Sequence, residues 1–173
     1  MIRIIINRAI LFFIMALAFF AASTAAAAEL EVSGWIPYWS AETGIEDAQK
    51  NLDKLTEINP FVYTVKQDGT VVSQSELNST PWRTLQERAK QNNVRYVPTV
   101  MWSNREAIHE VLSDPVKRQA HISSIAREVF TYGFDGIDID YENKAAKTRV
   151  YFSQFLKELN DAIGFNKWIM CTI

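Results

Sequence analysis

The spacing of hydrophobic residues changes several times along this chain, from short apolar runs to stretches in which apolar residues recur every three or four positions. Short runs are typical of buried strands, and the wider spacing is typical of amphipathic helices. Strands are therefore predicted within residues 31–39, 61–65, 94–101, 132–142 and 167–173, with helices between them. Strands that alternate with helices indicate parallel β-α-β units, so the predicted fold class is α/β.

Proline, glycine and capping residues mark the predicted boundaries. Asn59-Pro60 ends the first helical stretch, residues 40–58. Thr80 and Asp114 each precede a proline, which predicts an N-cap followed by the first helical residue. Gly133 is placed to end the helix that begins after Asp114, because glycine accepts the left-handed conformation.

The stretch from Tyr132 to Glu142 ends in acids spaced two residues apart. In an extended strand alternate side chains share a face, so one face carries Gly136, Asp138, Asp140 and Glu142, and the other carries Ile137, Ile139 and Tyr141. Neighbouring acids lie ~6.6 Å apart along the strand, and the apolar flanks indicate that they face an enclosed space. Repulsion and burial are then expected to raise at least one carboxyl pKa, which leaves a proton donor beside an ionised neighbour.

The pattern Asp135-x-x-Asp138-x-Asp140-x-Glu142 resembles the DxxDxDxE signature of glycoside hydrolase family 18, the chitinases and their relatives. The resemblance implies the fourth strand of a (β/α)8 barrel with Glu142 as the general acid. Asp140 would orient the 2-acetamido group of the substrate and Asp138 would hold Asp140. Asp135 would cap the motif structurally together with Gly136.

The same resemblance implies a reaction and a partner. Family 18 enzymes cleave β-1,4 bonds of N-acetylglucosamine-containing polysaccharides, chitin or peptidoglycan type, with retention of configuration. The acetamide carbonyl oxygen of the substrate serves as the nucleophile, so no cofactor is expected. A catalytically inactive glycan-binding protein or a truncated remnant of such an enzyme is the alternative.

The third predicted strand distinguishes branches of the family. Pro98 lies at its centre and predicts an edge or a bulge. Many chitinases carry Ser-x-Gly-Gly at this strand end, where this chain has Trp102-Ser103-Asn104. The Tyr-Val-Pro-Thr strand and the Pro-Phe-x-Tyr segment at 60–63 resemble instead the bacterial branch associated with spore and cell-wall glycans.

Aromatic residues near the predicted strand ends are candidates for contact with a sugar ring, since flat rings stack on its apolar face. The candidate substrate-binding residues are Trp39, Tyr38, Trp102 and Tyr141. Packing in the core is the alternative for Tyr38 and Trp39, and for the nearby Trp35.

No metal site is predicted. A calcium loop that began at Asp138 would need glycine at its sixth position and glutamate at its twelfth, where this chain has Asn143 and Arg149. His109-Glu110 is not followed by a second histidine at zinc-ligand spacing, so His109 and His121 are expected to have surface or helix-packing roles.

The first 28 residues have the features of a signal peptide. Arg3 and Arg8 precede an apolar segment at 10–22, and three alanines at 26–28 fit a cleavage site before Glu29. The expected location is therefore secreted or cell-envelope, with no membrane contact after cleavage. An uncleaved membrane anchor is the alternative.

Cleavage would remove two of the 18 basic residues and none of the 20 acidic residues, which leaves a net charge of −4. A mildly acidic protein gives no support for nucleic-acid binding.

Residues 29–173 are expected to form a partial family 18 catalytic domain. They provide about four and a half β-α units, whereas a complete barrel typically takes about 250 residues. The resemblance also places a tyrosine on the sixth strand and a tryptophan on the eighth, and neither has a counterpart here. We therefore expect the N-terminal portion of a (β/α)8 barrel, apparently truncated.

Overall fold

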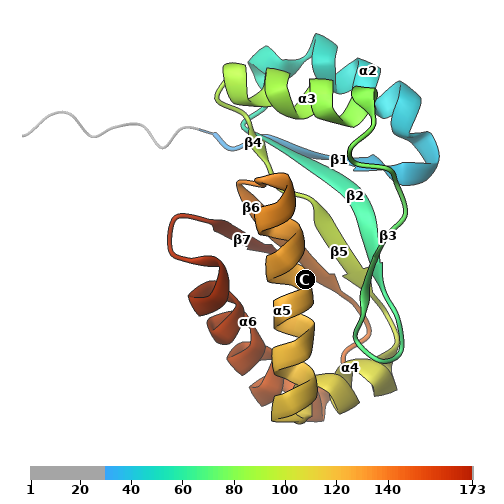
Figure 1. Ribbon diagram of the computed structural model, residues 1–173, viewed down its shortest axis with the longest axis vertical. Helices are drawn as coiled ribbons and strands as arrows, with labels where there is room; N and C mark the ends of the chain where they lie inside the picture. Colours follow the sequence, from blue (N-terminus) through green and yellow to red (C-terminus); the bar gives the residue numbers. More distant parts are fainter. Residues whose placement is uncertain (1–29, 173) are drawn as a thin grey trace, which may run out of the picture. The chain divides into compact units, whose positions relative to one another are not determined.

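The computed structural model describes residues 30–172, and the predicted signal peptide, residues 1–28, lies outside them. Helices and strands alternate along the described chain (Figure 1). The strands are β1 Ser33–Pro37, β2 Glu57–Val65, β3 Val71–Ser73, β4 Arg95–Tyr96, β5 Thr99–Trp102, β6 Gly136–Tyr141 and β7 Trp168–Cys171. The helices are α2 Ala41–Lys50, α3 Thr80–Gln91, α4 Arg105–Ser113, α5 Pro115–Tyr132 and α6 Arg149–Ile163.

One sheet runs through the described residues, in the order β1-β2-β5-β6-β7, and all four pairings along this path are parallel. The short strand β4 also pairs in parallel with β2. The α/β class and its parallel sheet are thus confirmed. The strand β3 was not predicted, and it is antiparallel to the end of β2.

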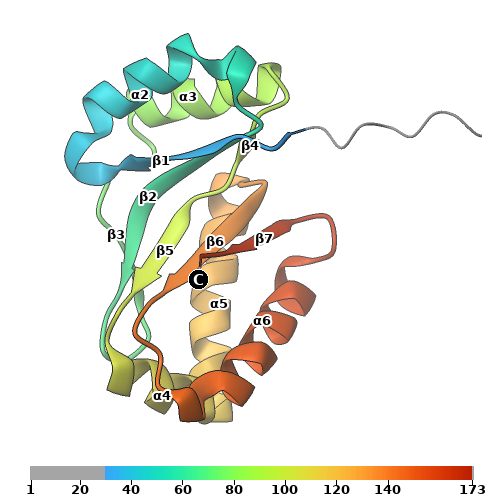
Figure 2. The same cartoon turned by 180° about the vertical axis from the view of Figure 1, so that it is seen from behind.

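The sheet has two chemically different faces. One face, here called the helix face, carries Ile137 and Ile139, which are fully buried in a core shared with α5 and α6. The opposite face, here called the acid face, carries Asp138 and Asp140. Figure 2 shows the strands in front of α5, with the helix behind the sheet. Because strand side chains alternate, the helix layer covers the apolar positions and leaves the acids on the other side.

Proline, glycine and capping residues mark several of the observed element boundaries. Pro98 was predicted to make an edge or a bulge in one strand, whereas it lies between two strands, β4 and β5. The Asp114 side chain caps α5 by accepting hydrogen bonds from the backbone N–H groups of Val116 and Lys117. Gly133 ends α5 with φ of 65°. At α3 the prediction was off by one residue, because Ser79 is the N-cap and Thr80 is already helical.

Two predictions from periodicity were wrong. The helix expected over 40–58 ends at Lys50, and β2 begins at Glu57, so Pro60 lies within a strand. The first seven residues of β2 are all buried, and a strand buried on both faces shows no alternation in its sequence. The spacing of apolar residues after Asp114 also predicts Phe130 on the buried side of α5, yet Phe130 is exposed. It follows the buried Val129, and one helical step turns a side chain by about 100°.

None of the helices within residues 30–172 is both long and apolar enough to span a bilayer.

Candidate active site

The acids lie on β6, which is buried along its whole length between β5 and β7. Gly136 begins this strand. A Cβ atom there would lie 2.1 Å from the carbonyl oxygen of Trp168 on β7, so no larger residue fits without moving the strands apart. Asp135 stands just before the strand, and its carboxylate accepts a hydrogen bond of 2.9 Å from the backbone N–H of Tyr96. These two residues therefore fix where β6 starts relative to its neighbours.

Asp138 is the most enclosed of the acids, and three side chains donate hydrogen bonds to it. Its Oδ2 accepts from Thr99 Oγ1 at 2.8 Å and from Trp35 Nε1 at 3.3 Å. Its Oδ1 accepts from Thr172 Oγ1 at 3.3 Å. Both oxygens are thus engaged as acceptors, and the carboxylate is held in one orientation on the acid face.

Asp140 is also buried, but its surroundings differ. Burial raises the pKa of its carboxyl group above the ordinary value, and the charges of Glu142 and Asp138 raise it further, while Lys144 opposes the shift. Within residues 30–172 its Oδ1 has no hydrogen-bond partner. The predicted rise of one carboxyl pKa in this cluster is thus found at Asp140. A buried carboxyl group with a free oxygen is suited to bind a polar group of an incoming molecule.

Glu142 differs from the other two acids because its side chain is exposed. The prediction that all three acids face an enclosed space is therefore wrong for Glu142, which is the first residue beyond β6. Its backbone N–H donates a 2.9 Å hydrogen bond to the carbonyl oxygen of Trp102. The following loop is anchored by Arg105, which donates to Asn143 Oδ1 at 2.7 Å. The backbone thus holds Glu142 beside Asp140 while its carboxylate faces solvent.

Aromatic side chains lie next to Asp138 at the end of β1. Trp35, Tyr38 and Trp39 are each at least one-third exposed, so the core alternative does not describe them. The Trp35 and Trp39 rings pack edge-on against Phe61, with centroids 5.6 Å and 5.7 Å away. Since Trp35 also donates to Asp138, this aromatic group adjoins the acids.

Two of the predicted substrate-binding residues were assigned wrongly. Trp102 and Tyr141 are buried on the helix face, where their rings pack against each other and against His121. The reason is the alternation of strand side chains: Trp102 and Tyr141 each follow an acid-face residue, Met101 and Asp140. They therefore cannot contact a ligand bound at the acids.

The donors that hold Asp138 were not predicted. The register pairs Thr99 with Asp138 across β5 and β6, and Thr172 follows the end of β7. Thr99 is one residue after Pro98, and a polar residue in an otherwise apolar strand was a usable signal. Trp35 was considered for packing in the core, and the hydrogen bond from its indole N–H to Asp138 was not predicted.

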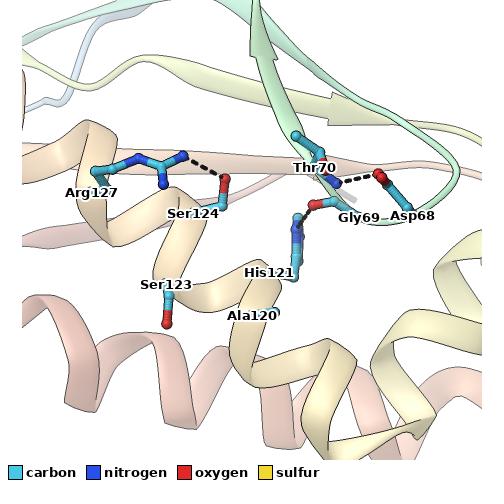
Figure 3. Close-up of a pocket in the computed structure, with 8 residues that line it drawn as sticks. All are labelled: Asp68, Gly69, Thr70, Ala120, His121, Ser123, Ser124 and Arg127. Atoms are coloured by element: carbon cyan, nitrogen blue, oxygen red, sulfur yellow. Dashed lines mark hydrogen bonds between the residues drawn. The ribbon is translucent and has the colours of Figure 1, made fainter.

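A cavity of about 270 Å³ lies on the other side of the sheet, between α5 and the turn that joins β2 to β3 (Figure 3). Its lining includes Asp68, His121, Ser124 and Arg127. Because α5 covers the helix face, this cavity is separate from the acids. Among residues 30–172 no group of three or more His, Cys, Asp or Glu side chains is arranged to hold a metal ion.

A parallel sheet with helices on one face and acids at its carboxyl-terminal edge is typical of (β/α)8-barrel enzymes, whose active sites lie at this edge. Residues 34–172 match the sequence profile of Glycosyl hydrolases family 18, and the chain belongs to this family.

Individual relatives agree with this assignment. The chain is 26% identical over 115 residues to YdhD, a sporulation-specific glycosylase by name, from Bacillus subtilis (strain 168), covering 66% of this chain and 27% of YdhD. A chitinase from Bacteroides thetaiotaomicron is 26% identical, with a TM-score of 0.66 over 83% of this chain and 46% of the chitinase. The spore cortex-lytic enzyme SleL of Bacillus cereus is 18% identical, with a TM-score of 0.68 over 83% of this chain and 35% of SleL. The chain thus spans less than half the length of each relative, and it resembles the spore and cell-wall branch of the family.

Proposed function

We propose that this chain carries the catalytic strand of an exported glycosidase that cleaves β-1,4 bonds of N-acetylglucosamine-containing glycans with retention of configuration. The observation that carries the proposal is the arrangement of Asp138, Asp140 and Glu142 on and just beyond one strand, with Asp138 held by three donors.

Each acid has a distinct role in the proposed reaction. Protonated Glu142 gives its proton to the glycosidic oxygen as the bond to the anomeric carbon breaks. The acetamide carbonyl oxygen of the substrate bonds to that carbon, so the enzyme supplies no nucleophile. Water then attacks the same carbon, the bond from the acetamide oxygen to that carbon breaks, and Glu142 takes up a proton from the water.

The surroundings of Asp140 support its role beside the acetamido group. The pKa of Asp140 is raised, and its Oδ1 has no hydrogen-bond partner within residues 30–172. Such a carboxyl group is suited to share a hydrogen bond with the acetamide while the acetamide carbonyl oxygen bonds to the anomeric carbon. Asp138 is fixed by its donors, and its charge contributes to the raised pKa of Asp140. The exposed ring of Trp39 is placed to stack on a sugar, as is the ring of Trp35.

Substitution of Glu142 by glutamine tests the proposal. The variant keeps the shape of the side chain but cannot transfer a proton, so turnover of N-acetylglucosamine oligomers and of cell-wall glycan strands should fall by about 10²- to 10⁴-fold. Binding of the oligomers should persist, measured by calorimetry on protein recovered from the medium or the cell envelope.

Glu106→Gln is the matched control, because Glu106 is an exposed glutamate in the first turn of α4 and the charge change is the same. Equal turnover by Glu142→Gln and the wild type would refute the catalytic role of Glu142. Binding without turnover in the wild type would favour the second candidate, a glycan-binding protein, for which the exposed indole rings of Trp35 and Trp39 provide the support.

A further inference from the structure

A buried histidine connects three separate parts of the chain on the helix face. His121 of α5 is 2% exposed. Its Nδ1 lies 2.5 Å from the carbonyl oxygen of Gly69, in the turn between β2 and β3. Its Nε2 forms a hydrogen bond with the hydroxyl of Tyr141, the last residue of β6. The imidazole thus bridges the turn and the strand that carries the acids.

The partners determine where the protons lie. A carbonyl oxygen can only accept, so Nδ1 carries the hydrogen and donates to Gly69. Burial lowers the pKa of His121 to about 4, so the ring is neutral near pH 7 and Nε2 accepts. Burial also raises the pKa of Tyr141 well above its ordinary value, so its hydroxyl stays protonated and donates to Nε2. The Tyr141 hydroxyl thus donates to His121 Nε2, and His121 Nδ1 donates to the carbonyl oxygen of Gly69.

Aromatic packing and hydrogen bonds both hold the His121 ring. The rings of Phe155 and Trp102 contact His121 at centroid distances of 5.6 Å and 5.3 Å. On another side the ring borders the cavity of about 270 Å³, whose lining includes Asp68, Ser124 and Arg127 (Figure 3). Since stacking does not distinguish the two ring nitrogens, the two hydrogen bonds determine which way Nδ1 and Nε2 point.

Tyr141 is the residue directly before Glu142. The Glu142 carboxylate is exposed, so its position depends on the backbone that precedes and follows it. The Tyr141 carbonyl oxygen also accepts a hydrogen bond from Lys144 Nζ, which ties the loop after Glu142 to the same residue. A shift of the Tyr141 side chain would therefore move Glu142 relative to Asp140.

We propose that His121 is a positioning residue: through the Tyr141 hydroxyl it ties the end of β6, and with it the backbone of Glu142, to the turn between β2 and β3. The kinetic consequence rests on the function proposed above, whereas the effect on the backbone does not.

Three substitutions separate the two hydrogen bonds. Tyr141→Phe removes only the hydroxyl. His121→Asn places an amide near Nδ1 and so keeps the donor to Gly69, but it loses the acceptor for Tyr141. His121→Gln places its amide near Nε2 and keeps an acceptor for Tyr141. We expect Tyr141→Phe and His121→Asn to lower kcat about tenfold with KM unchanged, because small misplacements of reacting groups reduce rate strongly. His121→Gln should retain more turnover than His121→Asn.

Tyr63→Phe is the matched control. Tyr63 is equally buried, and its hydroxyl donates a 3.2 Å hydrogen bond to Glu128 Oε2, which is remote from the acids. Loss of the Tyr63 hydroxyl should lower the melting temperature about as much as loss of the Tyr141 hydroxyl does, but kcat should not change.

Amide hydrogen exchange of residues 142–148 provides a measurement that needs no activity. Tyr141→Phe and His121→Asn should speed exchange in this loop, and Tyr63→Phe should not. If both variants lose stability like Tyr63→Phe while kcat and loop exchange match the wild type, the positioning role is overturned. If the wild type hydrolyses no glycan, the proposed function fails, and the exchange measurement still decides the role of His121.

Discussion

The two buried acids of β6 occupy different environments although they are only two residues apart. Asp138 accepts hydrogen bonds through both oxygens, whereas Asp140 has a raised pKa and an oxygen without a partner in the described part of the chain. The difference arises from the neighbouring strands, because Thr99 and Thr172 reach Asp138 but not Asp140. Two aspartates on the same face of one strand can therefore have different chemical roles.

The raised pKa of Asp140 predicts how stability varies with pH. A carboxyl group whose pKa is higher in the folded protein than in the unfolded chain lowers stability as the pH rises. The loss begins near the unfolded-state pKa of 3.8 and is complete once the pH has passed the folded-state pKa. Asp140→Asn does not titrate, so its stability relative to the wild type should increase over that window and then level off. At pH 7 the melting temperature of Asp140→Asn should therefore exceed that of the wild type.

Urea titrations between pH 3.5 and 8 measure this effect. Asp53→Asn is the control, because Asp53 is exposed and its substitution removes the same charge. A difference between Asp140→Asn and the wild type that stays constant across the pH range would contradict the prediction.

At the scale of elements, the contact between β6 and β7 depends on a missing side chain. Gly136→Ala would place its Cβ 2.1 Å from the Trp168 carbonyl oxygen and 2.7 Å from the Trp168 Cβ. The strands must separate, and we expect a loss of about 3 kcal/mol in the free energy of unfolding, the upper end of the overpacking range.

Gly34→Ala provides the comparison for this prediction. Gly34 lies in β1, and a Cβ atom there would have no heavy atom within 4 Å. The alanine should be neutral or stabilising by about 0.5 kcal/mol, since glycine loses more backbone entropy on folding. Similar losses for both variants in chemical denaturation would show that the β6–β7 contact is not the cause.

Element boundaries were predictable where one residue determines the backbone. Gly133 and Asp114 act through their own conformation or side chain, and Pro98 acts through its missing N–H, so sequence alone located them. The start of β2 and the side chain of Phe130 depend on which surfaces meet in three dimensions. The donors to Asp138 were missed for the same reason, because the register between strands decides which side chains oppose each other.

The acid motif itself was recognised from four residues, but the sheet faces of Tyr141 and Trp102 were predicted wrongly. The alternation that placed Asp140 on one face also assigns Tyr141 and Trp102 to the other. Applying it to them would have removed both from the substrate-binding residues.

At the scale of the whole described chain, a second charged cluster lies at the opposite end of the sheet from Glu142. Glu57 of β2 is buried, and its Oε2 accepts a 2.9 Å hydrogen bond from Arg95 Nε of β4. Arg95 also pairs with Glu31 before β1 and lies 4.6 Å above the Trp168 ring of β7. One guanidinium thus connects the segment before β1 with β2 and β7.

Removal of this guanidinium should destabilise the protein. Arg95→Met keeps most of the side-chain volume but leaves the Glu57 carboxylate buried without its cation. We expect a loss of about 3 kcal/mol, measured by urea denaturation. The double variant Arg95→Met with Glu57→Gln should recover much of the loss, because the uncompensated charge is then absent. No recovery would indicate that Arg95 acts through packing on Trp168 instead.

The hydrogen bonds that hold Asp138 also bear on the synthesis of the protein. Their donors lie 103 residues before it, 39 residues before it and 34 residues after it along the sequence. A nascent chain that has just left the ribosome with Asp138 therefore lacks one of its three donors until Thr172 emerges. Until then the carboxylate stays hydrated, and final closure of this end of the sheet must wait for translation of β7.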